Sequence, residues 1–250
     1  LHARSKGRNY DDPAHPSGQT AAKTAIDTFV CPSTPVATHE RDPVHGYGGI
    51  DYMVVALSDV DARTDSPTYG MRTTPSGSDA WKSQVVAPML DCKGSGFQRV
   101  TDGTSHTILW IEDAGRAHPE VDSFGAFSTR FTPVSGAADP INMSSGGNGR
   151  RAFAWADADA VSNGYSGPSN STGSRVAQLN NYSTPVGGPE ECRWSVNNCG
   201  PNDEPFAFHN GGLNATMGDG SVRFLSDSMD GVVVKWLCGA QDGIVINENL

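Results

Sequence analysis

The sequence feature that most constrains the fold is a pair of short apolar runs, residues 213–217 and 222–225, joined by a segment that contains Asp219 and Gly220. An Asp-Gly pair between apolar runs is a strong signal for a β-hairpin, because both residues tolerate the positive φ that a tight turn demands. Apolar and polar residues alternate in the first run, which predicts one buried and one solvated strand face: Leu213, Ala215 and Met217 against Asn214 and Thr216. We therefore expect an antiparallel hairpin closed at Asp219-Gly220.

The composition favours a turn-rich fold with limited helix. The 250 residues include 29 Gly and 16 Pro, and only 18% of the residues are charged. Long helices draw on Glu, Lys, Leu and Ala, and few stretches here supply them. The length suits one large domain or two small ones, each able to bury a core. We predict a single α+β head over residues 1–250, dominated by an antiparallel β-sheet with long loop insertions.

A second hairpin is expected around Asp102 and Gly103, which separate residues 97–100 from the apolar run 107–111. Both faces of the 107–111 run are apolar, so this strand is predicted to lie in the centre of the sheet and to be covered on both sides. Another strand is expected within residues 47–57, where apolar residues recur at every second position.

The chain divides into four parts. Residues 1–35 are expected to form an irregular arm and a short helix, which Thr20 caps and which ends near Phe29. Residues 47–112 form the first part of the sheet. Residues 115–205 form a loop-rich insertion, with a short strand at 152–155, and residues 206–250 carry the Asp219 hairpin and a C-terminal helix and strand.

The C-terminal helix is expected to be capped by Asp227 or Ser228 and to end at Gly239. Its buried stripe is predicted to consist of Val233, Trp236 and Leu237, which have the i, i+3, i+4 spacing of one helix face. Residues 243–246 are expected to form a last short strand.

Three segments together resemble one known family. His209, nine further residues and then Asp219-Gly220 resemble the H-X9-DG signature of the prepilin-type, pseudopilin-like proteins of planctomycete-type bacteria, a domain of unknown function. Phe29-Val-Cys-Pro-Ser33 resembles the family's "flCPS" segment, and residues 100–112, which end in Glu112, resemble its "itDGTSnTil..E" segment. The sequence departs from the family pattern at Thr34, usually Asp, and at His106, usually Asn.

The resemblance implies a pilin-like globular head that follows a prepilin peptidase site and a long apolar helix. The sequence begins at Leu1, downstream of such a helix, and is expected to be a processed or partial product. No run of 18 apolar residues occurs, so contact with a membrane is expected only through that missing helix. The net charge of −10 disfavours binding to nucleic acid, because an acidic surface repels phosphate.

The five cysteines leave their pairing open. Cys192 and Cys199 are close in sequence and form the candidate disulfide, which would close a short loop and contribute about 2 kcal/mol at most. The odd count leaves at least one thiol free or paired outside the chain. Cys238 lies in an apolar run and is the candidate for a buried free thiol.

A His209–Asp219 dyad for general-base chemistry is disfavoured, because an extended 213–217 strand places the two residues at opposite ends of the hairpin. We instead predict structural roles for His209, Asp219, Gly220, Asp102 and Gly103, and no catalytic residue. Ser105 and His106 are adjacent, so in a strand they face opposite sides and cannot form a nucleophile–base pair.

Asp157 and Asp159 are the candidate ligands of a calcium ion, since hard cations are bound by alternating loop carboxylates. Asp59 with Asp61, Asp102, and Glu112 with Asp113 offer similar carboxylates, and a solvated acidic loop explains all of these patterns equally well. Zinc is disfavoured, because the sequence has no C-x-x-C and no histidine pair at ligand spacing.

The sequence therefore predicts a non-catalytic, exported structural subunit at the cell surface or in a secretion apparatus, with other pilin-like subunits as partners. The alternative is an extracellular module that binds a carbohydrate or another polymer through the 115–205 loops. A hydrolase ranks last.

Overall fold

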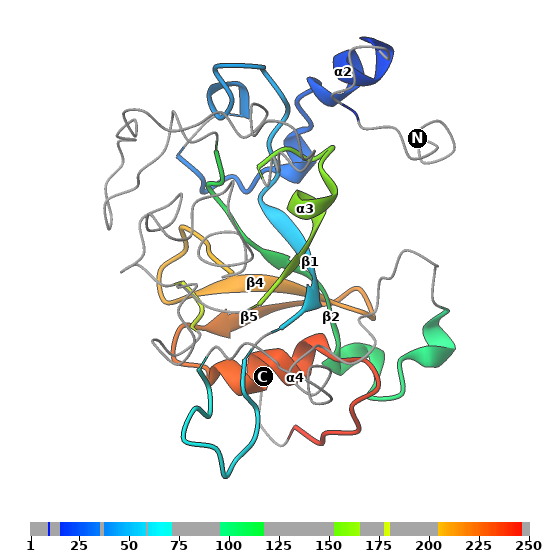
Figure 1. Ribbon diagram of the computed structural model, residues 1–250, viewed down its shortest axis with the longest axis vertical. Coiled ribbons are helices and arrows are strands. Elements are labelled where there is room, and N and C mark those ends of the chain that lie inside the picture. The colour runs from blue at the N-terminus through cyan, green and yellow to red at the C-terminus, as the bar shows by residue number, and fades with distance from the viewer. Residues whose placement is uncertain are drawn as a thin grey trace.

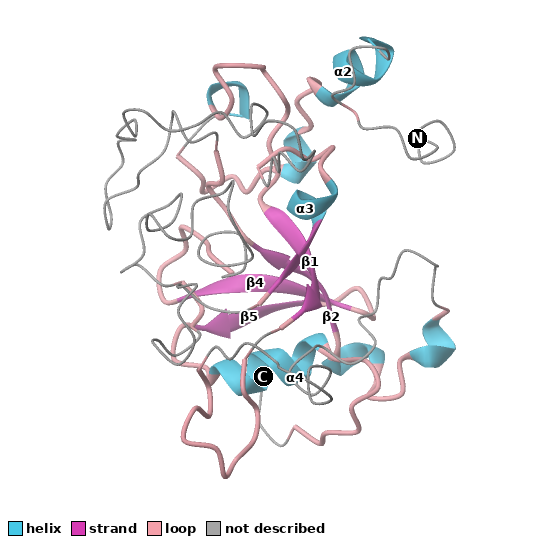
Figure 2. Ribbon diagram, in the orientation of Figure 1, coloured by secondary structure: helices cyan, strands magenta, loops and turns pink. Residues whose placement is uncertain are grey.

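The fold is taken from a computed structural model, which describes residue 10 and residues 16–35, 38–58, 60–71, 96–117, 153–165, 178–180 and 205–246. A five-stranded sheet lies at its centre, in the order β3-β1-β2-β4-β5 (Figure 1, Figure 2). The strands are β1 (Tyr52–Leu57), β2 (Ile108–Glu112), β3 (Ser162–Gly164), β4 (Gly212–Met217) and β5 (Val222–Ser226). Strands β1, β2, β4 and β5 pair antiparallel, and β3 pairs parallel with β1. Together with the helices, this is the predicted α+β class.

The Asp219-Gly220 hairpin is confirmed. β4 pairs with β5, Leu213 lies opposite Leu225, and Gly220 has a φ of +84°. Residues of β4 alternate as predicted, because Leu213, Ala215 and Met217 are buried and the two residues between them are half-buried. β2 lies between β1 and β4, so the central position predicted for the 107–111 run is also confirmed.

Helix α4 (Gly231–Cys238) covers one face of the sheet, where it packs against Ile111 and the buried residues of β4 (Figure 1). The expected caps were wrong: Asp230 caps the helix by accepting the N–H of Val232 over 2.8 Å. The expected stripe was correct only in part: Val233 and Leu237 are buried, but Trp236 is half-buried. Val232, Val234 and Lys235 are buried as well. The reason is that α4 contacts more than the sheet; for example, the Lys235 ammonium donates to the Val60 carbonyl.

The hairpin predicted at Asp102-Gly103 does not form. Residues Phe97–Arg99 and Thr104–His106 are 3-10 turns, and β2 pairs with β1 and β4 instead. The Asp102 carboxylate accepts the backbone N–H groups of Asp242 over 2.7 Å and Gly243 over 3.1 Å. This Asp-Gly pair therefore holds the C-terminal loop and does not close a two-stranded turn.

Two terminal predictions also need correction. Helix α2 spans Pro16–Ala22, because proline fits the first position of a helix, and the Thr20 hydroxyl donates to the Pro16 carbonyl and does not cap a helix. A separate 3-10 turn occupies Asp27–Phe29. Residues 243–246 form a loop, since Gly243 has a φ of +70° and the Asp242 carboxylate accepts the N–H of Ile244.

The remaining short elements are a 3-10 turn, Thr38–Glu40, and helix α3, Ala158–Val161. The strand expected at 152–155 is a single bridge between Gly49 and Ala154. Among the described residues, no helix is long and apolar enough to cross a membrane.

Candidate functional site

The candidate site lies on the face of the sheet opposite α4. Ile111 belongs to the core that includes α4, and side chains alternate along a strand, so the next residue, Glu112, points to the other face. Glu112 ends β2 and lies opposite Tyr52 of β1. Glu112 is only 3% exposed, because two segments from distant parts of the sequence contact it.

Three side chains meet at this position, and we call them the Cys-Glu-His cluster: Cys31, Glu112 and His209. Cys31 Sγ lies 3.6 Å from Glu112 Oε1 and 3.6 Å from His209 Nε2. His209 Nε2 lies 3.1 Å from Glu112 Oε1. The Cys31 residue is 1% exposed, and the side chains of Glu112 and His209 are 4% and 26% exposed. One sulfur, one nitrogen and one oxygen thus converge in a largely buried place.

The outer atoms of the cluster have partners of their own. Ser33 Oγ lies 3.4 Å from His209 Nδ1. The backbone N–H of Asn214 donates to Glu112 Oε2 over 2.6 Å, and Asn214 Nδ2 lies 3.3 Å from each carboxylate oxygen. These contacts hold the imidazole and the carboxylate so that Nε2 and Oε1 face the Cys31 sulfur.

A buried carboxylate, Asp51, fixes the segment that carries Cys31. Its oxygens accept hydrogen bonds from the Cys31 N–H over 2.8 Å, the Thr34 hydroxyl over 2.8 Å and the Gly115 N–H over 2.9 Å. The Arg41 guanidinium donates to both oxygens, over 2.5 and 2.8 Å, and both side chains are fully buried. We call these five residues the Asp51 knot; it ties residues 31–34 to the start of β1 and the end of β2.

Thr34 is suited to its position beside Asp51. The Thr34 hydroxyl donates to Asp51 Oδ2. An aspartate at position 34 would place a second carboxylate beside Asp51, and like charges in a buried site repel. Threonine therefore suits a site in which Asp51 is the acceptor.

The electrostatics of the cluster do not favour a nucleophilic thiol. Burial raises the pKa of the Cys31 thiol, and the Glu112 and Asp51 carboxylates raise it further. The same burial and neighbouring charges raise the pKa of Tyr52 to about 12. Reactive thiols need a lowered pKa, and in a catalytic triad the carboxylate binds the imidazole nitrogen that points away from the nucleophile. Here the thiol and the carboxylate face the same nitrogen.

The two ends of the H-X9-DG segment lie apart. His209 belongs to the Cys-Glu-His cluster, whereas Asp219 lies beyond β4 in an exposed turn. Asp219 Oδ1 accepts the N–H of Ser221 over 2.9 Å and its hydroxyl over 2.6 Å, and these bonds lower the pKa of Asp219. The backbone N–H of Asp219 donates to the Thr104 carbonyl over 3.1 Å. His209 therefore contacts Cys31, Ser33 and Glu112, and not Asp219.

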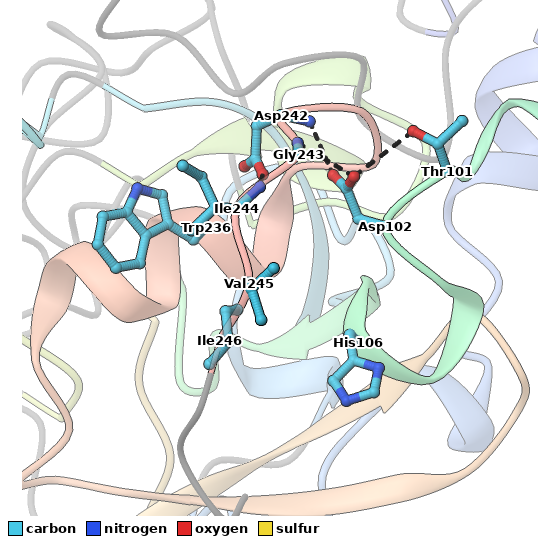
Figure 3. Close-up of a pocket in the computed structure, with 9 residues that line it drawn as sticks. All are labelled: Thr101, Asp102, His106, Trp236, Asp242, Gly243, Ile244, Val245 and Ile246. Atoms are coloured by element: carbon cyan, nitrogen blue, oxygen red, sulfur yellow. Dashed lines mark hydrogen bonds between the residues drawn. The ribbon is translucent and has the colours of Figure 1, made fainter.

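A pocket of about 290 Å³ lies between the segment that carries Asp102 and His106, Trp236 of α4, and the loop that follows α4 (Figure 3). Asp102, His106 and Trp236 line it together with residues 242–246. Gly103, with a φ of +97°, follows Asp102 and leads into the 3-10 turn that carries His106. The pocket therefore owes its shape to the Asp102 contacts with the C-terminal loop.

The statement that Ser105 and His106 cannot pair was wrong. The two residues lie in a 3-10 turn and not in a strand, and Ser105 Oγ lies 3.0 Å from His106 Nδ1. His106 is exposed, and no carboxylate of the described residues accepts a hydrogen bond from it. Among the described residues, His106 therefore lacks the carboxylate partner that orients the base in serine hydrolases.

The predicted calcium ligands do not belong to the Cys-Glu-His cluster. Asp157 is 8% exposed and its Oδ2 accepts the Tyr10 hydroxyl over 3.0 Å. Asp159 lies in α3, and its side chain is outside the described part of the structure. Asp61 accepts hydrogen bonds within its own loop, from Arg63, Ser66 and Thr68, and Asp59 also lies outside the described part.

Two thiols can be placed. Cys238 is buried and free, as predicted, and burial raises the pKa of its thiol. Cys31 is the second buried free cysteine. The candidate disulfide Cys192–Cys199 and most of the 115–205 loops lie outside the described residues.

Sequence reasoning missed the Cys-Glu-His cluster because its members are far apart in the chain. Cys31 and Glu112 are separated by 81 residues, Glu112 and His209 by 97. Spacing rules for metal or catalytic motifs cover short intervals. The usable signal was that each of the three family-like segments contributes one member of the cluster.

Comparison with known protein families gives a match over most of the chain. A family model described as "Protein of unknown function (DUF1559)" matches residues 3–231, a range that includes the whole Cys-Glu-His cluster and the Asp51 knot. No curated protein and no solved structure shows a significant match to the chain.

Proposed function

The chain belongs to the family of proteins of unknown function DUF1559, and from that premise we propose that it is a non-catalytic, exported structural subunit. In this proposal it assembles with other pilin-like subunits, as type IV pilins and type II secretion pseudopilins do, into a fibre or a surface apparatus. The sheet and its covering helix form the head of such a subunit.

The observation that supports this proposal is that the polar residues of the three family-like segments contact one another and hold the fold together. Their polar residues bind one another: Cys31, Glu112 and His209 meet in one cluster, and Cys31 is also held by the Asp51 knot. These contacts join the N-terminal segment to β1, β2 and the turn before β4. In a head attached to an N-terminal stem, such contacts would hold the N-terminal segment to the sheet in addition to its backbone hydrogen bonds.

The 102–104 segment lies against the other end of β4. The Thr104 carbonyl accepts the N–H of Asp219, and the Thr107 carbonyl accepts the N–H of Gly218. The motifs thus brace β4 at both ends, and this arrangement serves shape. The calcium ion at Asp157 and Asp159 remains a prediction, which a calcium titration followed by calorimetry would test.

Electron microscopy of the producing cells tests the proposal, with antibody raised against the purified chain. We expect the label on regular filaments or on a discrete envelope assembly. Two matched Asp→Asn variants sharpen the test: Asp51→Asn breaks the buried knot and should reduce labelled assemblies, whereas Asp219→Asn alters an exposed turn and should leave them. A folded wild-type chain that is found only as a dispersed monomer would contradict the proposal.

A further inference from the structure

We propose that the Cys-Glu-His cluster is a binding site for a divalent transition metal ion of the zinc class, ligated by Cys31 Sγ, Glu112 Oε1 and His209 Nε2. The site goes beyond the structural role proposed above, and its test does not depend on whether the protein assembles.

The distances within the cluster match those of a tetrahedral zinc site. Bonds of about 2.3 Å to sulfur and about 2.0–2.2 Å to nitrogen and oxygen give ligand–ligand edges of about 3.6 Å with sulfur and about 3.4 Å between nitrogen and oxygen. The observed separations are 3.6 Å for Sγ–Nε2, 3.6 Å for Sγ–Oε1 and 3.1 Å for Nε2–Oε1. One ion at the common centre can therefore reach all three atoms with small adjustments.

The three ligand atoms converge on a single point. Sγ, Nε2 and Oε1 lie within 4.8 Å of one another, and in the Nδ1–H tautomer of His209 each offers a lone pair. In the metal-free chain the Cys31 thiol donates to Glu112 Oε1, and the Nε2–H tautomer of His209 donates to the same oxygen. A cation at the centre replaces these hydrogen bonds with three metal–ligand bonds.

The charges balance on binding. Cys31 and Glu112 bring two negative charges as thiolate and carboxylate, and His209 is neutral, so a divalent ion makes the buried cluster neutral. Uncompensated charge in a buried site is costly, which favours the neutral complex. Binding forms three metal–ligand bonds and releases the thiol proton of Cys31 to solvent.

Contacts around the cluster orient the ligands as metal sites require. Ser33 Oγ at His209 Nδ1 leaves Nε2 to face the cluster, and the Asn214 N–H at Glu112 Oε2 leaves Oε1 to do the same. When the Ser33 hydroxyl accepts the Nδ1–H, the Nε2 lone pair is left for the ion, and such outer contacts set the direction of ligands. The 26% exposure of the His209 side chain gives an ion a path from solvent.

The ligand types select the metal. Calcium and magnesium prefer oxygen ligands throughout, so a thiolate and an imidazole disfavour them. Zinc accepts sulfur, nitrogen and oxygen together and adopts tetrahedral geometry. Three protein ligands leave the fourth position to water or to an added ligand.

Cobalt(II) is the probe that tests the site, because tetrahedral cobalt with a thiolate ligand has a sulfur-to-metal charge-transfer band and strong visible bands. The full chain is stripped with a chelator, titrated with Co²⁺ and then displaced with Zn²⁺. We expect one ion per chain and a charge-transfer band that zinc abolishes. At a free zinc concentration 100 times Kd, the Tm should rise by roughly 5–10 °C.

Matched variants assign the ligands. Cys31→Ser should abolish the charge-transfer band, and Cys238→Ser, which removes the other buried free thiol of the described residues, should leave it unchanged. Glu112→Gln should weaken zinc binding at least 10-fold, and His106→Gln should leave it unchanged. Ser33→Ala removes only an outer contact and should weaken binding by about 10-fold. Circular dichroism of each metal-free variant checks folding.

X-ray absorption of the zinc-loaded wild type needs no variant, so it decides the matter even if Cys31→Ser does not fold. We expect one sulfur at about 2.3 Å and nitrogen or oxygen neighbours at about 2.0 Å. The proposal fails if the wild type binds no stoichiometric ion, if the bound zinc has no sulfur neighbour, or if a folded Cys31→Ser variant keeps the charge-transfer band.

Discussion

The two ends of β4 place chemically similar groups in different surroundings. At the start of the strand, Asp51 and Glu112 are buried and accept hydrogen bonds from residues 10 to 102 positions away in the chain. At the end of the strand, Asp219 is exposed and its carboxylate accepts hydrogen bonds from Ser221, two positions away. The first end joins segments that are otherwise separate, whereas the second shapes a turn whose strands already pair.

The difference shows that the contribution of a carboxylate to stability depends on whether water can take its place when the carboxylate is removed. When a buried acceptor is removed, its donors are left without a hydrogen-bond partner and without water, and the full desolvation penalty of these donors follows. An exposed acceptor is replaced by solvent. We call the two regions the cluster end and the turn end, and the predictions below test the contrast between them.

The largest effect is expected at the Asp51 knot. Asp51→Asn leaves the fully buried Arg41 guanidinium without a counter-charge, and removal of one partner of a buried ion pair typically costs about 3–5 kcal/mol. Urea unfolding of the metal-free chain measures the loss. Asp219→Asn is the matched change at the turn end and should have a much smaller effect. Equal losses of unfolding free energy in the two variants would show that the cluster end and the turn end do not differ in this way.

A smaller loss is expected from Glu112→Gln in the metal-free chain. The Asn214 N–H donates to Glu112 Oε2, and one orientation of the glutamine places an NH₂ group against that donor. Loss of a buried charged acceptor should lower the free energy of unfolding by about 1–3 kcal/mol. Hydrogen exchange should show faster exchange of the Asn214 amide, while the Thr216 amide near the turn end serves as the internal reference. Unchanged exchange at Asn214 would show that the carboxylate does not hold the strand.

Two glycines allow the same Gly→Ala substitution to be compared at the two ends of β4. Gly211 at the cluster end and Gly220 at the turn end have φ values of +82° and +84°, and an added Cβ meets nothing within 4 Å at either position. Alanine should cost only the strain of the left-handed conformation, about 1 kcal/mol at each site. Thermal unfolding should therefore give similar Tm losses for Gly211→Ala and Gly220→Ala. A large excess at Gly211 would mean that the cluster also depends on the backbone path.

The smallest effect concerns pH at the turn end. Burial raises the pKa of Asp242, and the nearby Asp102 charge raises it further. A raised folded-state pKa means that the contribution of Asp242 is fully present below its unfolded pKa of about 3.9 and is lost as pH rises through the folded pKa. Asp242→Asn should therefore stabilise the chain by about 0.5 kcal/mol at pH 7 and not at pH 3. Urea unfolding at both pH values measures this, and stabilisation confined to pH 3 would reverse the assigned sign.

The same dipeptide shows how far the sequence predicted the structure. Asp219-Gly220 closes a hairpin because the flanking runs pair with each other, which local alternation predicts. Asp102-Gly103 does not, because its carboxylate accepts hydrogen bonds from backbone groups 140 and 141 residues away. No local pattern contains that information. The cluster was beyond prediction for the same reason, since Cys31, Glu112 and His209 each lie in a separate segment.

The distance in the chain between Cys31 and His209 has a consequence for biosynthesis. These two residues are 178 positions apart, yet their side chains are in contact. Contacts between such distant residues form slowly, because the entropy of closing a large loop is lost before the contacts contribute any stabilising free energy. A ribosome releases the N-terminal segment first, so this segment cannot dock until the last fifth of the chain emerges. Completion of the sheet is thereby coupled to release of its carboxyl-terminal strands.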